Sequence, residues 1–393
     1  MLLLMIVVLP FLGLVLPLLA GHGRRALCTL LAALAPLVAL ALLLTLADAT
    51  LSGLVLQAGF EWLPGLGLNP GLRLDGLGLL FSLLILGIGL LVILYAHYYL
   101  GEDEPVGRFY AFLLLFMGAM LGLVLSANLL QMLVFWELTS LSSFLLIGFW
   151  GHRSDARRGA RMALAVTGGG GLALLAGILL IGQVVGSFDL ATVLAAGDLI
   201  RAHALYPLIL VLVLLGVFTK SAQFPFHFWL PHAMAAPTPV SAYLHSATMV
   251  KAGVFLLARL YPALSGTDLW FYLVSFTGLI TLLFGAVMAL FQHDLKGLLA
   301  YSTISHLGLI TLLFGLDTRL AAVAAVFHII NHATFKASLF MAAGIIDHET
   351  GSRDMRRING MWHYMPHTAV LAMVAASAMA GVPLLNGFLS KEM

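Results

Sequence analysis

The sequence predicts an all-α polytopic membrane protein, and three features of its 393 residues support this prediction. Hydrophobic residues make up 62% of the chain, charged residues make up 9%, and the mean hydropathy is +1.06. Soluble domains are about 45–50% apolar and about 25% charged, so a soluble fold of this size could not bury so much apolar surface. The apolar residues form long continuous runs, not the alternating strands of a membrane barrel. Helices formed by such runs satisfy their own backbone hydrogen bonds, as lipid requires.

Twelve apolar runs are long enough to cross a membrane, for which a helix needs about 20 residues. In chain order, helices 1 to 12 are expected at Leu2–Ala20, Leu27–Leu46, Leu77–Leu100, Phe109–Leu125, Asn128–Trp150, Met162–Val185, Ala204–Phe224, Val240–Tyr261, Leu269–Phe291, Leu298–Leu316, Leu320–Ile346 and Thr368–Leu389. The first run lacks the positively charged start of a signal peptide, because Arg24 and Arg25 follow it. We therefore keep it as helix 1 of a single membrane domain over residues 1–393.

Lysine and arginine residues are unevenly divided between the two sets of alternate loops. One set holds eleven of them: Arg24, Arg25, Arg108, Arg153, Arg157, Arg158, Arg161, Lys296, Arg353, Arg356 and Arg357. The other set holds four: Arg73, Arg201, Arg259 and Arg319. Positively charged loops face the cytoplasm, so we expect a multi-pass protein of the plasma membrane with its N-terminus outside.

Charge and cysteine content exclude several classes of function. The net charge of +2 is too small to indicate a nucleic-acid partner. Cys28 is the only cysteine, which excludes a disulfide, a zinc site built on cysteines and an iron–sulfur cluster. We expect the chain to bind no cofactor and no metal. A membrane redox enzyme with its own cofactor is a competing class, and the single cysteine argues against it.

Five charged side chains fall inside apolar runs: Glu137, Lys220, Lys251, Lys336 and Lys391. A charge at mid-bilayer costs at least about 2.5–3.5 kcal/mol, so these groups should face the bundle interior or a hydrated path. Each is therefore a candidate functional residue. Lys296, close to Asp294 at a helix start, could instead extend to the lipid headgroups.

Helices 5 and 7 carry a charge of each sign. Glu137 is the only charge of helix 5, so it is either protonated or paired with a buried cation, and Lys220 on helix 7 offers that cation. Pro225 cannot donate to the carbonyl of Ser221, so helix 7 should break just after Lys220. Broken helices mark ion sites in transporters, whereas the alternative is a proline kink that only eases packing.

Helix 11 carries His328, His332 and Lys336 at intervals of four residues, which places them on one face. A line of titratable groups inside a membrane is typical of a proton relay. The alternatives are a metal site, haem ligation and hydrogen-bonding histidines with a structural role. Ile329 stands where a metalloprotease motif would have its glutamate, and no third ligand is evident.

Neighbouring helices add polar groups and a glycine run. The polar groups are His245, Thr248 and Lys251 on helix 8, and Ser302, Ser305 and His306 on helix 10. The run Thr167–Gly171 in helix 6 lacks the ending of a phosphate-binding loop, so it indicates close helix packing.

The order of the helices predicts two inverted five-helix repeats after helices 1–3, which occupy residues 1–107. The first repeat covers residues 108–262 and the second, incomplete, covers residues 263–393. Five is odd, so the second repeat must be inverted relative to the first, and helices 7 and 12 then correspond. Lys391 follows Pro383 and Gly387, so helix 12 should also be broken. The fifth helix of the second repeat would follow Met393, and we expect the chain to be a fragment of a longer protein.

Several long motifs resemble the proton-pumping membrane subunits of complex I and of Mrp antiporters. They are Leu74–Leu77, Gln223–Pro231, Ala236–Ala242, Leu299–Gly308 and His332–Ala337. Within this family the sequence is most similar to the A subunit of Mrp Na⁺/H⁺ antiporters, through Trp136–Gly148, His245–Gly253 and Gly387–Glu392. The resemblance covers nearly the whole chain.

The resemblance implies a proton-translocating subunit of a multisubunit Na⁺/H⁺ antiporter, which is part of a transporter and not a stand-alone enzyme. It implies that Glu137 and Lys220 form the ion pair of a first half-channel and that Lys391 gates a second. Protons would pass between them through Lys251, His245 and the stripe of helix 11, beside His306. Its partners would be other membrane subunits, the lipid bilayer and H⁺, with Na⁺ as the candidate second ion. The alternative is a proton-pumping subunit of an NADH:quinone oxidoreductase or a related respiratory complex.

Overall fold

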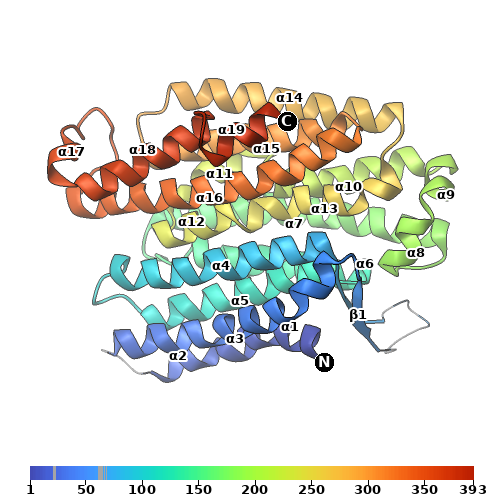
Figure 1. Cartoon of the computed structure of the whole chain (residues 1–393), viewed down its shortest axis with the longest axis horizontal. Coiled ribbons are helices and arrows are strands. Elements are labelled where there is room, and N and C mark those ends of the chain that lie inside the picture. Colours follow the sequence, from blue (N-terminus) through green and yellow to red (C-terminus); the bar gives the residue numbers. More distant parts are fainter. Residues whose placement is uncertain (21–23, 61–64, 66, 68) are drawn as a thin grey trace.

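The computed structural model describes residues 1–20, 24–60, 65, 67 and 69–393, and the described chain is a bundle of helices that run roughly along one direction (Figure 1). Ten spans are long and apolar enough to cross a membrane: α1 (Leu2–Gly13) with α2 (Val15–Leu19), α3 (Arg25–Leu51), α4 (Gly76–Tyr99), α5 (Val106–Leu125), α6 (Leu129–Ile147), α7 (Ser154–Val185), α12 (Thr238–Ser246) with α13 (Met249–Leu264), α14 (Asp268–Leu290), α15 (Leu295–Gly315) and α16 (Arg319–Thr350). Two shorter apolar helices are α10 (Tyr206–Lys220) and α18 (Pro366–Ala380). Each of the twelve predicted helices overlaps one of these segments, and the predicted fold class is confirmed.

Short elements join the long helices. They are α8 (Leu190–Ala195), α9 (Gly197–Ala202), η2 (Phe226–Phe228), α11 (Trp229–His232), η3 (Ala233–Ala235), α17 (Met361–Tyr364) and α19 (Asn386–Glu392). A small antiparallel hairpin, which the sequence did not predict, pairs β1 (Leu56–Gly59) with β2 (Gly71–Leu74). Gly71 anchors this hairpin to the α5–α6 connection, because its N–H donates to Gln131 Oε1 at 2.8 Å and its carbonyl accepts from the Ala127 N–H at 2.8 Å.

Several helices begin at a side chain that caps the first turn. Asp75 accepts from the Gly78 N–H at the start of α4, and Asn128 accepts from the Leu130 N–H at the start of α6. Asp294 caps α15 in the same way. Short polar side chains at this position satisfy backbone donors that the helix leaves free. They explain why these helices begin where they do.

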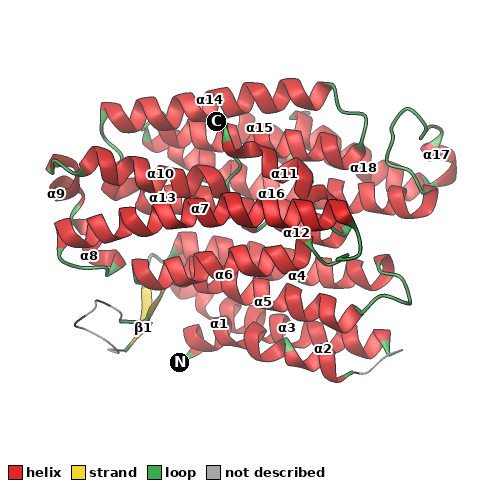
Figure 2. Cartoon of the chain, turned by 180° about the vertical axis from the view of Figure 1, so that it is seen from behind, coloured by secondary structure: helices red, strands yellow, loops and turns green. Residues whose placement is uncertain are grey.

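The helices are arranged as a wide, layered bundle. Helices α1–α3 lie along one edge of the bundle, and α14, α15 and the C-terminal helices lie along the other (Figure 1). Seen from behind, α7 crosses the middle of the molecule between α6 and α10 (Figure 2), and it packs against both. Among the long spans, α5 and α12–α13 are the most buried and α14 is the least buried.

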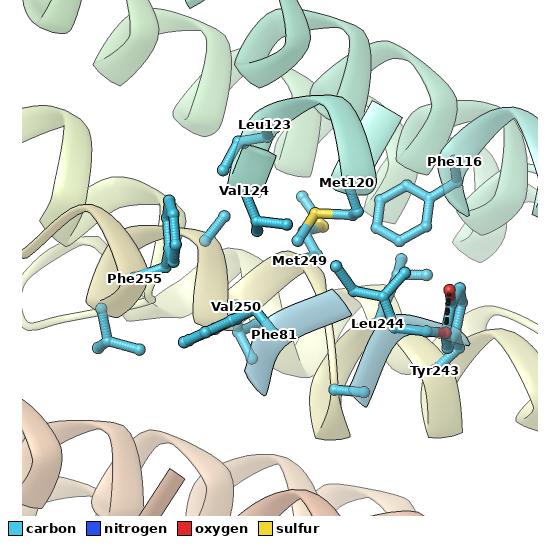
Figure 3. Close-up of a cluster of buried hydrophobic side chains, with 14 of the residues drawn as sticks. Phe81, Phe116, Met120, Leu123, Val124, Tyr243, Leu244, Met249, Val250 and Phe255 are labelled. Atoms are coloured by element: carbon cyan, nitrogen blue, oxygen red, sulfur yellow. Dashed lines mark hydrogen bonds between the residues drawn. The ribbon is translucent and has the colours of Figure 1, made fainter. Parts of the chain in front are cut away.

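The apolar core at the middle of the bundle joins α4, α5, α12 and α13 (Figure 3). Phe81 and Phe255 meet edge to face with ring centroids 4.9 Å apart, and Phe116 and Tyr243 meet at 5.8 Å. The Tyr243 hydroxyl donates to the Ile85 carbonyl at 2.9 Å. This packing holds α12 and α13 in the interior, where their polar residues lie away from lipid.

Four apolar helices are interrupted within the described residues, and the first of them divides into α1 and α2 at Leu14. The other three carry predicted site residues. The two predicted breaks are present, since α10 ends at Lys220 and α18 ends at Ala380 before α19 begins. The third break, at Ala247 and Thr248 between α12 and α13, was not predicted. The correspondence of the first two breaks through inverted repeats remains a prediction.

The charged loops gather at two opposite ends of the bundle. At one end, Asp294 pairs with Arg353 at 3.1 Å, and the Asp294 and Asp354 backbones form a β-bridge. At the other end, Arg259 on α13 forms an ion pair with Asp75, which also pairs with Arg73 at 3.1 Å. The α17 connection therefore lies at the end opposite to the hairpin, α8 and α9 (Figure 1).

Candidate functional site

The break after Lys220 is stabilised by side chains that replace the missing helical hydrogen bonds. The Ser221 N–H still bonds to the Val217 carbonyl, and Ala222 then turns the chain with a φ of 48°. The Trp229 indole folds back and donates to the Thr219 carbonyl at 2.9 Å. Pro225 has no N–H with which to continue the helix. The sequence therefore ends α10 at the lysine, inside the bundle.

Lys220 is completely buried and is held by the neighbouring helix α6. Its ammonium donates to the Trp136 carbonyl at 3.0 Å and to Ser140 Oγ at 2.7 Å. It also lies 5.1 Å from the centre of a Trp136 ring, within reach of a cation–π interaction. Polar atoms on one turn of α6 thus compensate a charge that has left water.

Glu137 lies in the same turn of α6, but it points toward α7. Its Oε1 is buried and lacks a hydrogen-bond partner among the residues that the structure describes. No oxygen of Glu137 lies within 4.0 Å of the Lys220 ammonium. Glu137 and the Lys220 ammonium therefore lie at the same turn of α6 without direct contact, and the ion pair expected between them remains a prediction.

The break between α12 and α13 places two predicted residues on its two sides. His245 is buried in the last turn of α12, and its Nδ1 has no hydrogen-bond partner among the described residues. Its ring lies 6.4 Å from the Trp229 ring and 6.1 Å from the Phe340 ring. Lys251 lies in the first turn of α13, is fully buried, and donates to the Ile329 carbonyl of α16 at 3.0 Å. The break thus brings Lys251 to the helix that carries the histidine stripe.

The two breaks also contact each other. The Ser221 hydroxyl donates to the Val250 carbonyl at 2.6 Å and accepts from the Val254 N–H at 3.0 Å. Gly253 permits this approach, because a Cβ there would overlap Ser221 Oγ. Lys220 and Lys251 are each next to one of these bonded residues, while their ammonium groups donate to α6 and to α16, respectively.

Three histidines form a buried cluster between α15 and α16. His306 Nδ1 and His328 Nε2 are 2.9 Å apart, and His328 Nδ1 lies 3.0 Å from Ser390 Oγ of α19. The His332 ring lies 5.5 Å from the His306 ring, and both of its nitrogens are buried without a partner among the described residues. Lys336 continues the stripe and donates to Ser302 Oγ. The structure therefore joins Ser302 and His306 of α15 with the stripe of α16, whereas the Ser305 hydroxyl donates to the Leu282 carbonyl of α14.

Lys391 differs from the other predicted lysines. It is exposed in α19, and its ammonium donates to the Met379 and Ala380 carbonyls at 2.9 and 3.0 Å. These carbonyls are at the end of α18, where a helix lacks partners for them. Its predicted role as a gate remains a prediction.

Lys296 is a buried residue and not a headgroup-facing one. It is 2% exposed and donates to the Ala236 carbonyl at 3.2 Å. It contributes to a polar cavity of about 440 Å³ at one end of the bundle, with Tyr99, Arg153, Asp294, Asp347 and Arg353 among the lining residues. The sequence indicated the lysine, but its burial depends on how η3 packs over the start of α15.

Several polar partners in the site escaped sequence analysis. Ser140 is three residues after Glu137 on one helix, so helical spacing could have identified it. The Trp136 and Ile329 carbonyls could not have been identified, since every residue has a carbonyl. Among the described residues, no group of three His, Cys, Asp or Glu side chains is placed to hold a metal ion.

Comparison with known protein families identifies relatives of this chain. The family model described as NADH:quinone oxidoreductase/Mrp antiporter, TM, matches residues 126–393, and the model described as NADH-Ubiquinone oxidoreductase (complex I), chain 5 N-terminus, matches residues 62–110. The chain belongs to the NADH:quinone oxidoreductase/Mrp antiporter family. The resemblance predicted from the motifs is thereby confirmed.

Named relatives in this family are antiporter subunits. The chain is 67% identical over 342 residues to a Rhizobium meliloti protein named as a probable K(+)/H(+) antiporter A/B subunit, a match that covers 87% of this chain and 34% of that protein. It is 49% identical over 400 residues to the A subunit of the Na(+)/H(+) antiporter of Alkalihalophilus pseudofirmus, covering 98% of this chain and 50% of the relative. The chain thus spans half or less of the length of these two relatives.

Two solved structures of the family share the fold. The Mrp complex from Dietzia sp. matches with a TM-score of 0.92 and 41% identity, over 99% of this chain and 42% of the matched chain. An archaeal respiratory complex, the membrane-bound sulfane sulfur reductase, matches with a TM-score of 0.88 and 26% identity, over 100% of this chain and 80% of that one. The chain is therefore a multi-pass membrane protein of this antiporter family.

Proposed function

We propose that the chain forms part of the proton-translocating subunit of a multisubunit monovalent cation/H⁺ antiporter. The observation that supports this most is a series of buried lysines and histidines that crosses the bundle. It runs from Lys220 at the end of α10, through Lys251 after the break between α12 and α13, to the histidine cluster of α15 and α16. Buried titratable groups inside a membrane protein are expensive, and they mark ion and proton pathways. The names of the relatives support the same transport class.

The proposed proton path begins at α6 and α10 and runs to α15 and α16. Lys220 and Glu137 exchange a proton at the first break, and Lys251 receives it at the second break. Lys251 lies beside the backbone of Ile329, next to His328 in the sequence. The path continues through His328, His306 and their neighbour Lys336.

The His306–His328 contact supports proton transfer in chemical terms. At 2.9 Å, one ring nitrogen must carry the proton and the other must accept it. The Ser390 hydroxyl on the far nitrogen of His328 can donate or accept, so it permits either tautomer. His332, with no fixed partner among the described residues, is free to take either state. His245 offers a branch toward Lys296 at the end of the bundle.

Sodium is the proposed exchanged cation, and potassium is tested beside it. The relative with 67% identity bears a K⁺/H⁺ name, whereas the relative with 49% identity bears a Na⁺/H⁺ name. Other membrane subunits and the surrounding lipid are the proposed partners. We also propose that the chain lies in the plasma membrane with its N-terminus outside, because the end richer in Arg and Lys should face the cytoplasm.

A proton-pumping subunit of a respiratory complex is the second candidate. It is favoured by the archaeal sulfane sulfur reductase, of whose matched chain this protein covers 80%. The two candidates differ in what drives the protons. Antiport is driven by added Na⁺ or K⁺, whereas respiratory pumping requires electron transfer.

The experiment uses everted membrane vesicles that contain the full-length protein with its native neighbouring subunits. A preformed pH gradient should collapse when Na⁺ or K⁺ is added, and Glu137→Gln should abolish this response without loss of assembled complex. Glu102→Gln is the matched control, since Glu102 is exposed and outside the spans. Normal exchange in the Glu137→Gln vesicles would refute the proposal, and gradients that respond only to electron donors would favour respiratory pumping.

A further inference from the structure

The space beside the Glu137 carboxylate is provided by a single glycine of α7. Gly171 is buried, and a Cβ at this position would overlap Glu137 Oε1 and lie 2.7 Å from Cδ, which is too close for both to be accommodated. The carboxylate therefore occupies the volume that any other residue would need for its own side chain. Oε1 has no hydrogen-bond partner among the described residues, so the site supplies room and no bond.

The adjacent glycine makes the same kind of contact with the neighbour of Lys220. A Cβ at Gly170 would overlap Thr219 Oγ1 and lie 2.7 Å from Thr219 Cβ. Helix α7 packs against both α6 and α10, so these two adjacent glycines contact the two helices that carry the proposed acid and base. We call Gly170 and Gly171 the α7 notch.

The other two glycines of the run do not contribute to this notch. A Cβ at Gly168 or Gly169 would meet no atom within 4 Å. Glycine inside a helix costs about 0.5–1 kcal/mol relative to alanine. Close packing against Thr219 therefore explains why position 170 is a glycine. Alanine variants of Gly168 and Gly169 serve as controls for a substitution on the same turn of α7.

We propose that Gly171 is a positioning residue, whose bare Cα provides the place where the Glu137 carboxylate rests away from the Lys220 ammonium. This inference rests on the proposed function. In the rest position the ammonium is satisfied by the Trp136 carbonyl and Ser140, so the acid and the base are separate. Because the notch forms no hydrogen bond with the carboxylate, little holds it there when a proton or the ammonium competes for it.

A methyl group at Gly171 removes this rest position. The carboxylate must then remain on the Lys220 side or adopt a strained rotamer, and the acid and base no longer separate between transport steps. A misplacement of about 1 Å at a reacting group can cost on the order of 100-fold in rate. For Gly171→Ala we expect a loss of about tenfold in cation-driven proton exchange per assembled complex.

The test measures exchange in everted vesicles for Gly171→Ala, Gly168→Ala, Gly169→Ala, Glu137→Asp and the double variant Gly171→Ala with Glu137→Asp. Rates are normalised to assembled complex. The two control glycines should exchange at the wild-type rate. Aspartate is one methylene shorter, so it should fit beside the added methyl, and the double variant should exceed the Gly171→Ala rate several-fold.

Rescue by the shorter acid is a result that a purely structural glycine would not give. Wild-type exchange in Gly171→Ala would overturn the inference, as would a loss that the double variant does not relieve. The proposed function is tested separately by Glu137→Gln: normal exchange in that variant refutes the transport role itself. An inactive Glu137→Gln beside a fully active Gly171→Ala refutes only the positioning role.

Discussion

The two predicted breaks place a lysine in contrasting surroundings. At the end of α10, Lys220 is fully buried and donates to groups of another helix, α6. In α19, Lys391 is exposed and donates to the last carbonyls of α18, the helix that precedes it. One lysine therefore donates to the side of a neighbouring helix, while the other caps the C-terminal end of one.

This difference shows that the same sequence pattern, a lysine beside a helix breaker, can give two electrostatic situations. A charge buried between helices must be compensated there, so changes in the neighbouring helix alter its free energy. A charge at a helix C-terminus is stabilised by free carbonyls and by the helix dipole, and any cation can supply that. The first situation favours proton exchange, and the second favours a fixed positive charge.

The largest expected difference in transport rate is between two variants in which each of these lysines is replaced with arginine. Lys220→Arg should reduce cation-driven proton exchange by about 100-fold or more, because arginine keeps its proton and general acid–base catalysis contributes about 10²–10⁴. Lys391→Arg keeps the cap and should lose only a few-fold. Equal losses in the two variants, measured per assembled complex in vesicles, would remove the distinction between the two breaks.

A second prediction extends the comparison to Lys336, which is buried like Lys220 and donates to Ser302. Lys336→Met should abolish proton-coupled exchange at near-normal protein levels, since it keeps the length and apolar packing. If Lys336 is a relay, Lys336→Arg should also fail. Wild-type vesicle rates in the arginine variant would show that Lys336 serves only as a structural charge.

A third prediction concerns a charge pair remote from both breaks. Burial raises the pKa of Asp75, but its hydrogen bond and charge interaction with Arg259 outweigh this and lower it to about 2. The carboxylate should therefore stabilise the fold by about 2 kcal/mol above about pH 4, and this contribution should disappear as the pH falls to about 2.

Asp75→Asn removes that contribution. At pH 7 the variant should unfold at a lower temperature than the wild type, and this difference should shrink between about pH 4 and about pH 2. Thermal unfolding of the solubilised complex at several pH values measures the lower unfolding temperature and its dependence on pH. Asp155→Asn is the control, since the Arg153–Asp155 pair is exposed and should contribute little. A pH-independent difference for Asp75→Asn would contradict the linkage.

The smallest effect is expected from two labelling variants that should leave transport unchanged. In a Cys28→Ser background, Ala191→Cys in the loop at residues 186–203 should react with an impermeant thiol reagent on intact cells. Ser154→Cys, in the arginine-rich loop at residues 151–161, should react only after the cells are opened. Preferential labelling at Ser154→Cys on intact cells would reverse the proposed orientation.

The helices and two of their breaks could be predicted because lipid leaves the sequence few alternatives. Apolar runs must be helical, and Pro225 has no N–H with which to continue the hydrogen bonds of α10. The break at Ala247 and Thr248 could not be predicted, since neither residue disfavours a helix strongly. The hairpin was missed because strands of four residues carry too little periodic pattern.

The sequence was enough to predict which residues belong to the site, but it was not enough to predict which groups they contact. Glu137 and Lys220 stand out as charges in apolar runs, whatever they touch. That Lys220 bonds to Ser140 while Glu137 turns toward Gly171 depends on how α6, α7 and α10 pack. Spacing along one helix, which identified the His328 stripe, gives no information about such contacts between helices.

The Ser221 hydroxyl has a consequence for the motions of the bundle. It lies between the Val254 N–H and the Val250 carbonyl, two groups that an uninterrupted α-helix pairs with each other. The start of α13 is therefore completed by an atom of Ser221, the residue that follows α10, so that the end of α10 and the start of α13 are held together. Amide hydrogen exchange at Val254 should report the opening of both as one cooperative unit, and Ser221→Ala should divide that unit into two that open independently.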